Sequence, residues 1–175
     1  TYKYDVNNLC FTVNQTSDNG FVIGGYTNAK TDYSGQPLVI KTDSLGNQEW
    51  IWQNGSVYDD LQSITSISND GNILVAYGHA TYQAPPYPVP SSLTQIWVVK
   101  IDNNGNEVWT RDYGGSYMGN QVWTITHLPD STYLIGGDAW ITDTSAYGWA
   151  YTRAFLLKIN ENGDSLWMRH YIHED

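Results

Sequence analysis

The segment LVIKTDSLGNQEW at residues 38–50 decides the fold, because the chain contains it three times. Residues 97–109 read WVVKIDNNGNEVW, and residues 155–167 read FLLKINENGDSLW. Each copy is an apolar run that ends in Lys-x-Asp or Lys-x-Asn, followed by a turn with glycine and then by tryptophan. The motif therefore recurs about every 58 residues, and a regular repeat of this length indicates one supersecondary unit that is used several times.

A second motif recurs in step with the first. The turn-forming clusters at 18–20 (DNG), 70–72 (DGN) and 130–132 (DST) lead into the apolar runs FVIGG, ILVAYG and YLIGG. Alternating apolar and polar residues, as at 10–14 and 122–126, precede these clusters and predict a further strand. Each unit therefore reads as four short strands joined by turns.

Four strands in every 50–60 residues are typical of a propeller blade. We therefore predict an all-β fold of β-propeller blades: three four-stranded antiparallel repeats of about 58 residues in one domain, 1–175. The units run approximately over 5–55, 56–115 and 116–172. Propellers close with roughly four to eight blades. Three blades predict a partial propeller, or one that closes with additional repeats or chains.

Composition excludes several classes of protein. The 175 residues include 8 Lys and Arg against 18 Asp and Glu, a net charge of −10 that does not favour nucleic acid. Aromatic residues make up 14%, too many for a disordered acidic tail. No apolar run reaches the roughly 20 residues of a membrane helix. One cysteine excludes an internal disulfide and a cysteine-based zinc site. The chain starts at Thr1, as expected of a processed or excised piece.

The third unit carries a resemblance. Its pattern joins Gly114-Gly115-Ser116, residues 120–125, residues 130–137 and Leu157-Lys158-Ile159-Asn160-x-x-Gly163-x-x-x-Trp167. It resembles the β-propeller repeats of secreted and cell-surface proteins of the Bacteroidetes type, which often carry a type IX secretion sorting domain, and more distantly the quinoprotein-like repeat. The resemblance implies a secreted or cell-surface location and a binding or scaffold role. The sequence shows no match to residues that would hold a quinone or its calcium.

The repeated residues favour structural interpretations. Trp50, Trp109 and Trp167 suit packing between adjacent blades, because an indole buries a large apolar area while its N–H reaches a carbonyl. Lys41, Lys100 and Lys158 stand two residues before Asp43, Asp102 and Asn160, so we expect each pair to close the following turn. Cys10 aligns with Val122 and is expected to be a small buried hydrophobe.

The long connections offer the best candidate site. The link between the second and third strands is short in the first unit and long in the other two, and in a propeller it shares a face with the link between units. Exposed rings with polar neighbours suit carbohydrate or protein recognition. The candidate ligand-binding residues are Tyr82, Tyr87, Trp140, Tyr147, Trp149, Tyr151, Arg153, Tyr58, Asp59 and Tyr117, with His79, Asp60 and Asn120 beside them. The alternative is that these rings pack against one another.

These observations favour a non-catalytic extracellular binding or scaffold module without cofactor or metal site. Its expected partners are a carbohydrate or protein ligand and further blades, from the same polypeptide or a homo-oligomer. Two alternatives stay open. The chain could be a fragment of a secreted propeller enzyme, such as a glycan hydrolase or lyase or a quinoprotein-like dehydrogenase. It could also be a passive spacer in a surface filament or adhesin.

Overall fold

The structure of the chain is a computed structural model. It describes residues 6–29, 35–54, 64–67, 70–82, 92–114, 118–142 and 150–171. The regular elements in these ranges are β-strands joined by turns. The described residues include no helix that is long and apolar enough to cross a membrane.

The strands form three four-stranded antiparallel sheets. The first contains β1 (Val6–Gln15), β2 (Phe21–Ala29), β3 (Gly35–Thr42) and β4 (Gln48–Gln53). The second contains β5 (Ile64–Ile67), β6 (Ile73–Tyr82), β7 (Ser92–Ile101) and β8 (Glu107–Tyr113), and the third β9 (Met118–His127), β10 (Thr132–Thr142), β11 (Ala150–Asn160) and β12 (Ser165–Tyr171). Strands lie in chain order within each sheet. The prediction of an all-β chain with three antiparallel sheets is confirmed.

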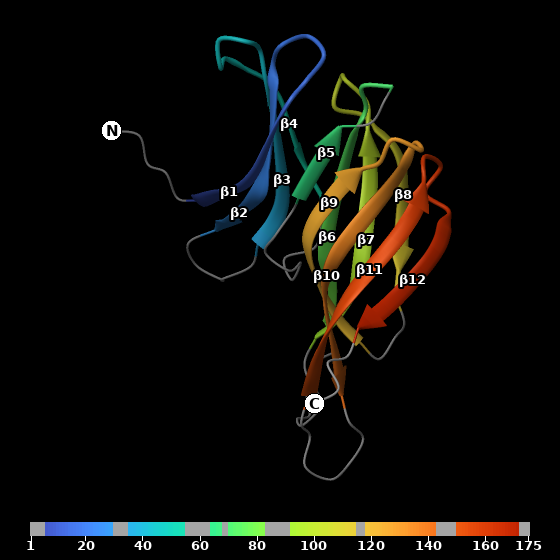
Figure 1. The fold of residues 1–175 in the computed structure, drawn as a ribbon. Coiled ribbons are helices and arrows are strands. Elements are labelled where there is room, and N and C mark those ends of the chain that lie inside the picture. The colour runs from blue at the N-terminus through green and yellow to red at the C-terminus, as the bar shows by residue number, and fades with distance from the viewer. Residues whose placement is uncertain are drawn as a thin grey trace.

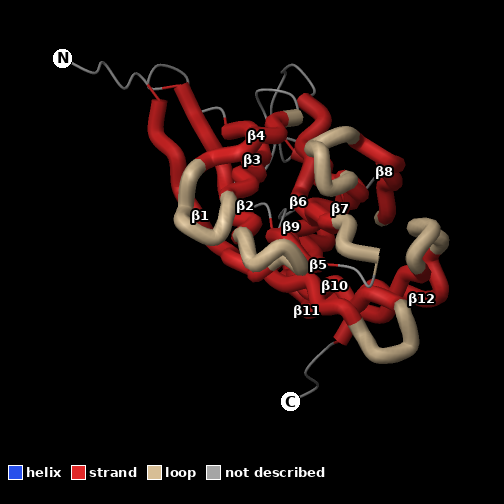
Figure 2. The backbone as a smooth tube through the Cα atoms, turned by 90° about the horizontal axis from the view of Figure 1, so that it is seen from above, coloured by secondary structure: helices blue, strands red, loops and turns tan. Residues whose placement is uncertain are grey.

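The three sheets stand in a row, with the second sheet in the middle (Figure 1). The strand β5 contacts both β1 and β9, so the first strands of the three sheets are neighbours. Seen from above, β8 and β12 lie at the far edges of the second and third sheets, away from β5 and β9 (Figure 2). The middle sheet is therefore the one that contacts both others.

Two hydrophobic clusters fill the spaces between sheets. One joins Val22, Val39 and Trp52 of the first sheet to alternate residues of β6 and β7. The other joins the remaining alternate residues of β6 and β7 to the third sheet. Residues 73–77 consequently have no exposed surface on either face. This explains why β6 reads as an uninterrupted apolar run, as strands buried on both faces do.

A bulge recurs in the first strand of the first and third sheets. The pairing of β1 with β2 shifts at Phe11, and that of β9 with β10 shifts at Trp123. A Cβ added to Gly25 would come within 1.8 Å of the Leu9 carbonyl oxygen, and one on Gly137 within 1.9 Å of that of Gln121. The glycines that end the apolar runs therefore let the bulged strand approach closely.

The prediction that Cys10 is buried is wrong: the side chain is exposed. Cys10 pairs with Gly25 and so shares the face of the first sheet that points away from the second sheet. Its counterpart Val122 is buried in the cluster between the second and third sheets. The two positions match in sequence but differ in whether another sheet covers them.

Each repeated lysine pairs with a different acid from the one expected. The Nζ atoms of Lys41, Lys100 and Lys158 lie 2.9, 2.9 and 2.7 Å from carboxylate oxygens that precede the second strand of each sheet, those of Asp18, Asp70 and Asp130. The residues two positions later cap their own turns instead. The Asp43 carboxylate, for example, accepts hydrogen bonds from the backbone N–H groups of Leu45 and Asn47, each at 2.8 Å. That local capping removes them as partners.

Candidate functional site

Two long hairpins, which we call arms, form the end of the molecule where the candidate loops begin. Pairing of β10 with β11 continues to Thr142 and Ala150, past the end of β12 at the rung of Ala154, while β9 stays paired with β10 as far as Ile141. Pairing of β6 with β7 likewise continues to Tyr82 and Ser92, past the edge of β8. Both arms point to the same end of the molecule, the lower end in Figure 1. Backbone ladders therefore hold the roots of both long connections.

The structure places four of the predicted ligand-binding residues on these arms. Tyr82 pairs with Ser92 at the tip of the described part of the β6–β7 arm. Trp140 and Tyr151 occupy adjacent rungs of the β10–β11 arm, and Arg153 lies one rung further in, opposite Ala139. Arg153 is half-buried. The other predicted residues lie outside the described part of the chain: Tyr58, Asp59, Asp60, Tyr87, Tyr117, Tyr147 and Trp149.

An aromatic cluster stands at the root of the β6–β7 arm. The His79 ring stacks on Trp97, with ring centroids 4.1 Å apart and planes 29° from parallel. The Tyr77 ring is tilted against Trp97, with ring centroids 6.3 Å apart. Tyr77 is fully buried and His79 is half-buried. These rings fix the arm to the core, and His79 and Trp97 each keep part of their surface exposed.

A second feature of this end was not singled out from the sequence. Trp123, the bulged residue of β9, is 51% exposed, and its indole N–H donates a hydrogen bond to the Asp138 carboxylate. An exposed ring beside a carboxylate offers stacking and hydrogen bonding together. Strict alternation over 122–126 places Trp123 on the same face as Ile125, and the bulge at Trp123 changes that facing. The neighbouring Gly136-Gly137 pair was the available signal for that bulge.

Asn120 does not belong to the expected exposed cluster. Its side chain is fully buried. A Cβ added to Gly114 would come within 2.9 Å of the Asn120 Nδ2 atom, so the amide packs against this turn. Gly114 has φ +103°, a conformation that favours glycine. Asn120 thus helps to shape the link between the second and third sheets.

The repeated tryptophans meet the turns of neighbouring sheets. The Trp50 indole lies over Gly105 of the second sheet, within 3.1 Å of where a Cβ would be, and its Nε1 donates a hydrogen bond of 3.0 Å to the Asn103 carbonyl. Trp109 lies over Gly163 of the third sheet with the same 3.1 Å approach. Trp167 stands on the third sheet, which is the last in the row, and is 37% exposed.

The lysine pairs lower the pKa values of two of their acids. The hydrogen bond from Lys158 lowers the pKa of Asp130 to about 2, with a smaller contribution from Thr132. The bond from Lys41 holds the pKa of Asp18 well below its usual range. Lys41 is almost fully buried and also contacts Glu49 at 2.7 Å. These pairs lie at the turn end of the sheets, opposite the arms, and bridge strands within one sheet.

The described residues contain no group of three or more His, Cys, Asp or Glu side chains arranged to hold a metal ion. No protein-family model matches the chain, and no curated protein matches it.

Proposed function

We propose that the chain is a non-catalytic binding or scaffold module of the β-propeller type, which recognises carbohydrate or protein through the loops at the ends of its two arms. The observation that carries this proposal is the pair of hairpin arms. The β6–β7 arm extends past both neighbouring strands, and the β10–β11 arm extends past β12 while β9 flanks it as far as Ile141. The two arms lie at one end of the molecule, and the connections that carry Tyr87, Tyr147 and Trp149 begin where their ladders stop.

The paired strands at the base of each arm favour ligand recognition over a role as a passive spacer. Binding residues are commonly carried on loops that a rigid scaffold positions. The arms continue as paired strands from the fully buried residues 73–77 of β6 and from β10, in which Tyr133, Ile135 and Ala139 are buried, so little ordering is needed at their roots when a ligand binds. A spacer would need only the sheets and their mutual packing.

The chemistry of the arms suits a polar, ring-shaped ligand or a protein surface. Tyr and Trp rings supply large contact areas, and Arg153 and Asp138 supply charges on β11 and β10. The exposed Trp123 ring, held by Asp138, adds a second contact near the arm of the third sheet. A secreted or cell-surface location belongs to the same proposal, since the resemblance of the repeats implies it.

Glycan-array binding tests the proposal. We expect the wild-type chain to bind a subset of glycans, and Trp140→Ala and Trp149→Ala to weaken that binding by at least about tenfold, as loss of a central aromatic contact does. Leu45→Ala is a suitable control, because Leu45 is exposed in a turn at the opposite end of the sheets. The same variants are to be tested against immobilised surface proteins.

Three results would count against the proposal. Absence of binding to glycans and proteins by the wild-type chain would favour a spacer. Binding that Trp140→Ala and Trp149→Ala leave unchanged would place the contact elsewhere. Glycan cleavage by the wild-type chain would favour the alternative of an enzyme fragment.

A further inference from the structure

The contact between successive sheets has a repeated design. A tryptophan on the fourth strand of one sheet covers a turn glycine of the next, as Trp50 covers Gly105 and Trp109 covers Gly163. Hydrogen bonds to turn carbonyls accompany the rings. The Trp50 Nε1 donates to the Asn103 carbonyl at 3.0 Å, and the Tyr113 hydroxyl donates to the Gly163 carbonyl at 2.6 Å. One side of the contact thus supplies rings and the other side supplies a turn.

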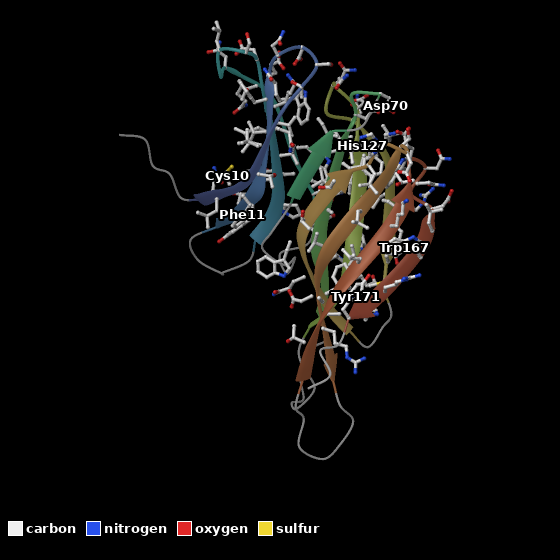
Figure 3. The ribbon with its side chains drawn as sticks, in the orientation of Figure 1. Cys10, Phe11, Asp70, His127, Trp167 and Tyr171 are labelled. Atoms are coloured by element: carbon white, nitrogen blue, oxygen red, sulfur yellow. The ribbon has the colours of Figure 1, made fainter. Side chains whose placement is uncertain are left out.

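The ring side of this contact is repeated on the outer edge of the third sheet, where no sheet in the described part of the chain covers it. Trp167 and Tyr171 correspond to Trp109 and Tyr113, and they are 37% and 48% exposed. They lie along β12 in Figure 3. The guanidinium of Arg169 lies 5.6 Å from the Trp167 ring centre, much as Arg111 lies 5.9 Å from Trp109. Trp167 is therefore already held beside the same kind of cation as its packed counterpart.

The turn side is repeated at the other end of the row, on the first sheet. Gly46 has φ +84°, close to the +86° of Gly105 and the +82° of Gly163. The Asp43 carboxylate holds this turn with the same two 2.8 Å hydrogen bonds that Asp102 makes in the second sheet. Among the described residues, nothing lies within 4 Å of the position that a Cβ on Gly46 would take. The receiving turn is thus formed and open.

The outward face of the first sheet is apolar along one full row. Val13, Ile23, Ile40 and Ile51 pair across the four strands, and Val13 and Ile51 are 65% and 47% exposed. The matching row of the third sheet is Ile125, Ile135, Leu157 and Met168. There the first three residues are buried and Met168 packs against the same cluster, because the second sheet covers them. The first sheet presents the surface that a preceding sheet would cover.

We propose that these two ends bind each other between two copies of the chain, head to tail. Trp167 of one copy covers Gly46 of the second, and Tyr171 donates its hydroxyl proton in a hydrogen bond to the Gly46 carbonyl. The row from Val13 to Ile51 packs against the outer face of the third sheet of the other copy. A two-fold axis makes the contact twice and gives six sheets, within the four to eight that close a propeller. A third copy would exceed that range.

A second copy is the occupant that the observations favour, because one chain carries both halves of a contact that it already makes twice internally. Each copy has a net charge of −10, so long-range repulsion opposes pairing. Salt screens that repulsion, and we expect the association to strengthen with ionic strength.

Sedimentation equilibrium of the full chain tests the pairing. We expect a mass of twice that of the single chain at high protein concentration. Trp167→Ala and Ile51→Lys, one at each end, are each expected to give a monomer. Tyr171→Phe should weaken pairing less than Trp167→Ala. The control is Trp109→Ala, which removes the same ring from an internal contact and should lower thermal stability without preventing the pairing of folded chains.

Mixing the two end variants distinguishes this contact from a symmetric patch. Each variant keeps the half that the other has lost, so the mixture should form a heterodimer with one intact contact and weaker affinity than the wild type. Cys10 supplies an independent readout, since it is the single cysteine and shares the outward face of the first sheet. Its reaction with a thiol reagent should slow as the protein concentration rises.

Three outcomes would overturn the proposal. The first is a folded wild-type chain that stays monomeric at all concentrations, as expected if other repeats of a longer polypeptide cover the ends. The second is a dimer that Trp167→Ala and Ile51→Lys leave intact. The third is an open series of larger oligomers, which would show that two copies do not close. None of these bears on ligand binding by the arms.

Discussion

Trp109 and Trp167 occupy the same place in neighbouring repeats, yet one is packed and the other is open. Trp109 is half-buried over a turn of the third sheet, and Trp167 has no fourth sheet to cover within the described part of the chain. The first sheet shows the complementary case. Its apolar row from Val13 to Ile51 is partly exposed, whereas the matching row of the third sheet is buried against the second sheet. Burial in this protein is therefore set by whether a neighbouring sheet exists, and the repeat sequence alone does not decide it. Substitutions at matched positions test this difference.

The largest expected effect comes from placing a lysine at the same position of the apolar row in a covered sheet and in an uncovered sheet. Val99 is fully buried between the first and second sheets, and Ile40 is its half-buried counterpart on the first sheet. Val99→Lys should cost about 3–5 kcal/mol, because it buries a charge without a partner. Ile40→Lys should cost clearly less, since its ammonium reaches water. Urea unfolding by circular dichroism, at a protein concentration low enough to keep the chain monomeric, measures both. Equal losses would contradict the comparison.

Removing the ring tests the tryptophan pair itself. Trp109→Ala should destabilise the single chain by about 2–3 kcal/mol, less than the loss of a fully buried indole. Trp167→Ala should change the free energy of unfolding by less than about 1 kcal/mol, as exposed positions usually do. The same dilute urea titration applies. A large loss for Trp167→Ala would mean that its ring already stabilises the isolated chain.

The turn glycines give a smaller and cleaner test. Gly105 and Gly46 have nearly equal positive φ, so an alanine at either position costs roughly 1–2 kcal/mol of backbone strain. Gly105→Ala should cost more than Gly46→Ala, because the new methyl group meets the Trp50 ring at 3.1 Å. Thermal melting of both variants measures the excess. Trp50→Ala added to Gly105→Ala should remove the excess if the ring is its cause.

The smallest effect concerns the lysine pair on the outer side of the third sheet. The folded pKa of Asp130, about 2, lies below its ordinary value of 3.8. A depressed pKa stabilises the fold above the unfolded value, and the contribution is lost as pH falls toward the folded value. We expect the urea midpoint to decline between pH 4 and pH 2, and Lys158→Met to reduce that decline. The exposure of Asp130 limits the size of the effect. An unchanged slope would show that other carboxylates dominate.

Much of the fold could be predicted from local patterns. The Lys-x-Asp runs, the turn glycines and the tryptophans mark strands and turns within each repeat, and these depend on neighbours in sequence. The partner of Lys41 could not be predicted in this way, because Asp18 lies 23 residues away and only the register of β2 and β3 brings it close. The exposure of Cys10 escaped prediction because it depends on the position of its sheet in the row.

The candidate site was predicted in part. The loop composition led to the arms, and the register now shows Trp140, Tyr151 and Arg153 on paired strands. Asn120 was misjudged because its burial beside Gly114 arises from the link between two sheets. Trp123 was overlooked because a bulge of one residue reverses the facing that strict alternation predicts.

The complete burial of residues 73–77 of β6 also has a consequence for how the chain opens. Each sheet takes its strands from one contiguous segment, so an end sheet can unfold while the other two stay paired. The middle sheet cannot, because its loss exposes both clusters at once. Backbone amides of β6 should therefore exchange with deuterium only through global unfolding, while those of β1 and β12 exchange through local fraying. The middle repeat therefore sets the rate at which the whole fold unfolds.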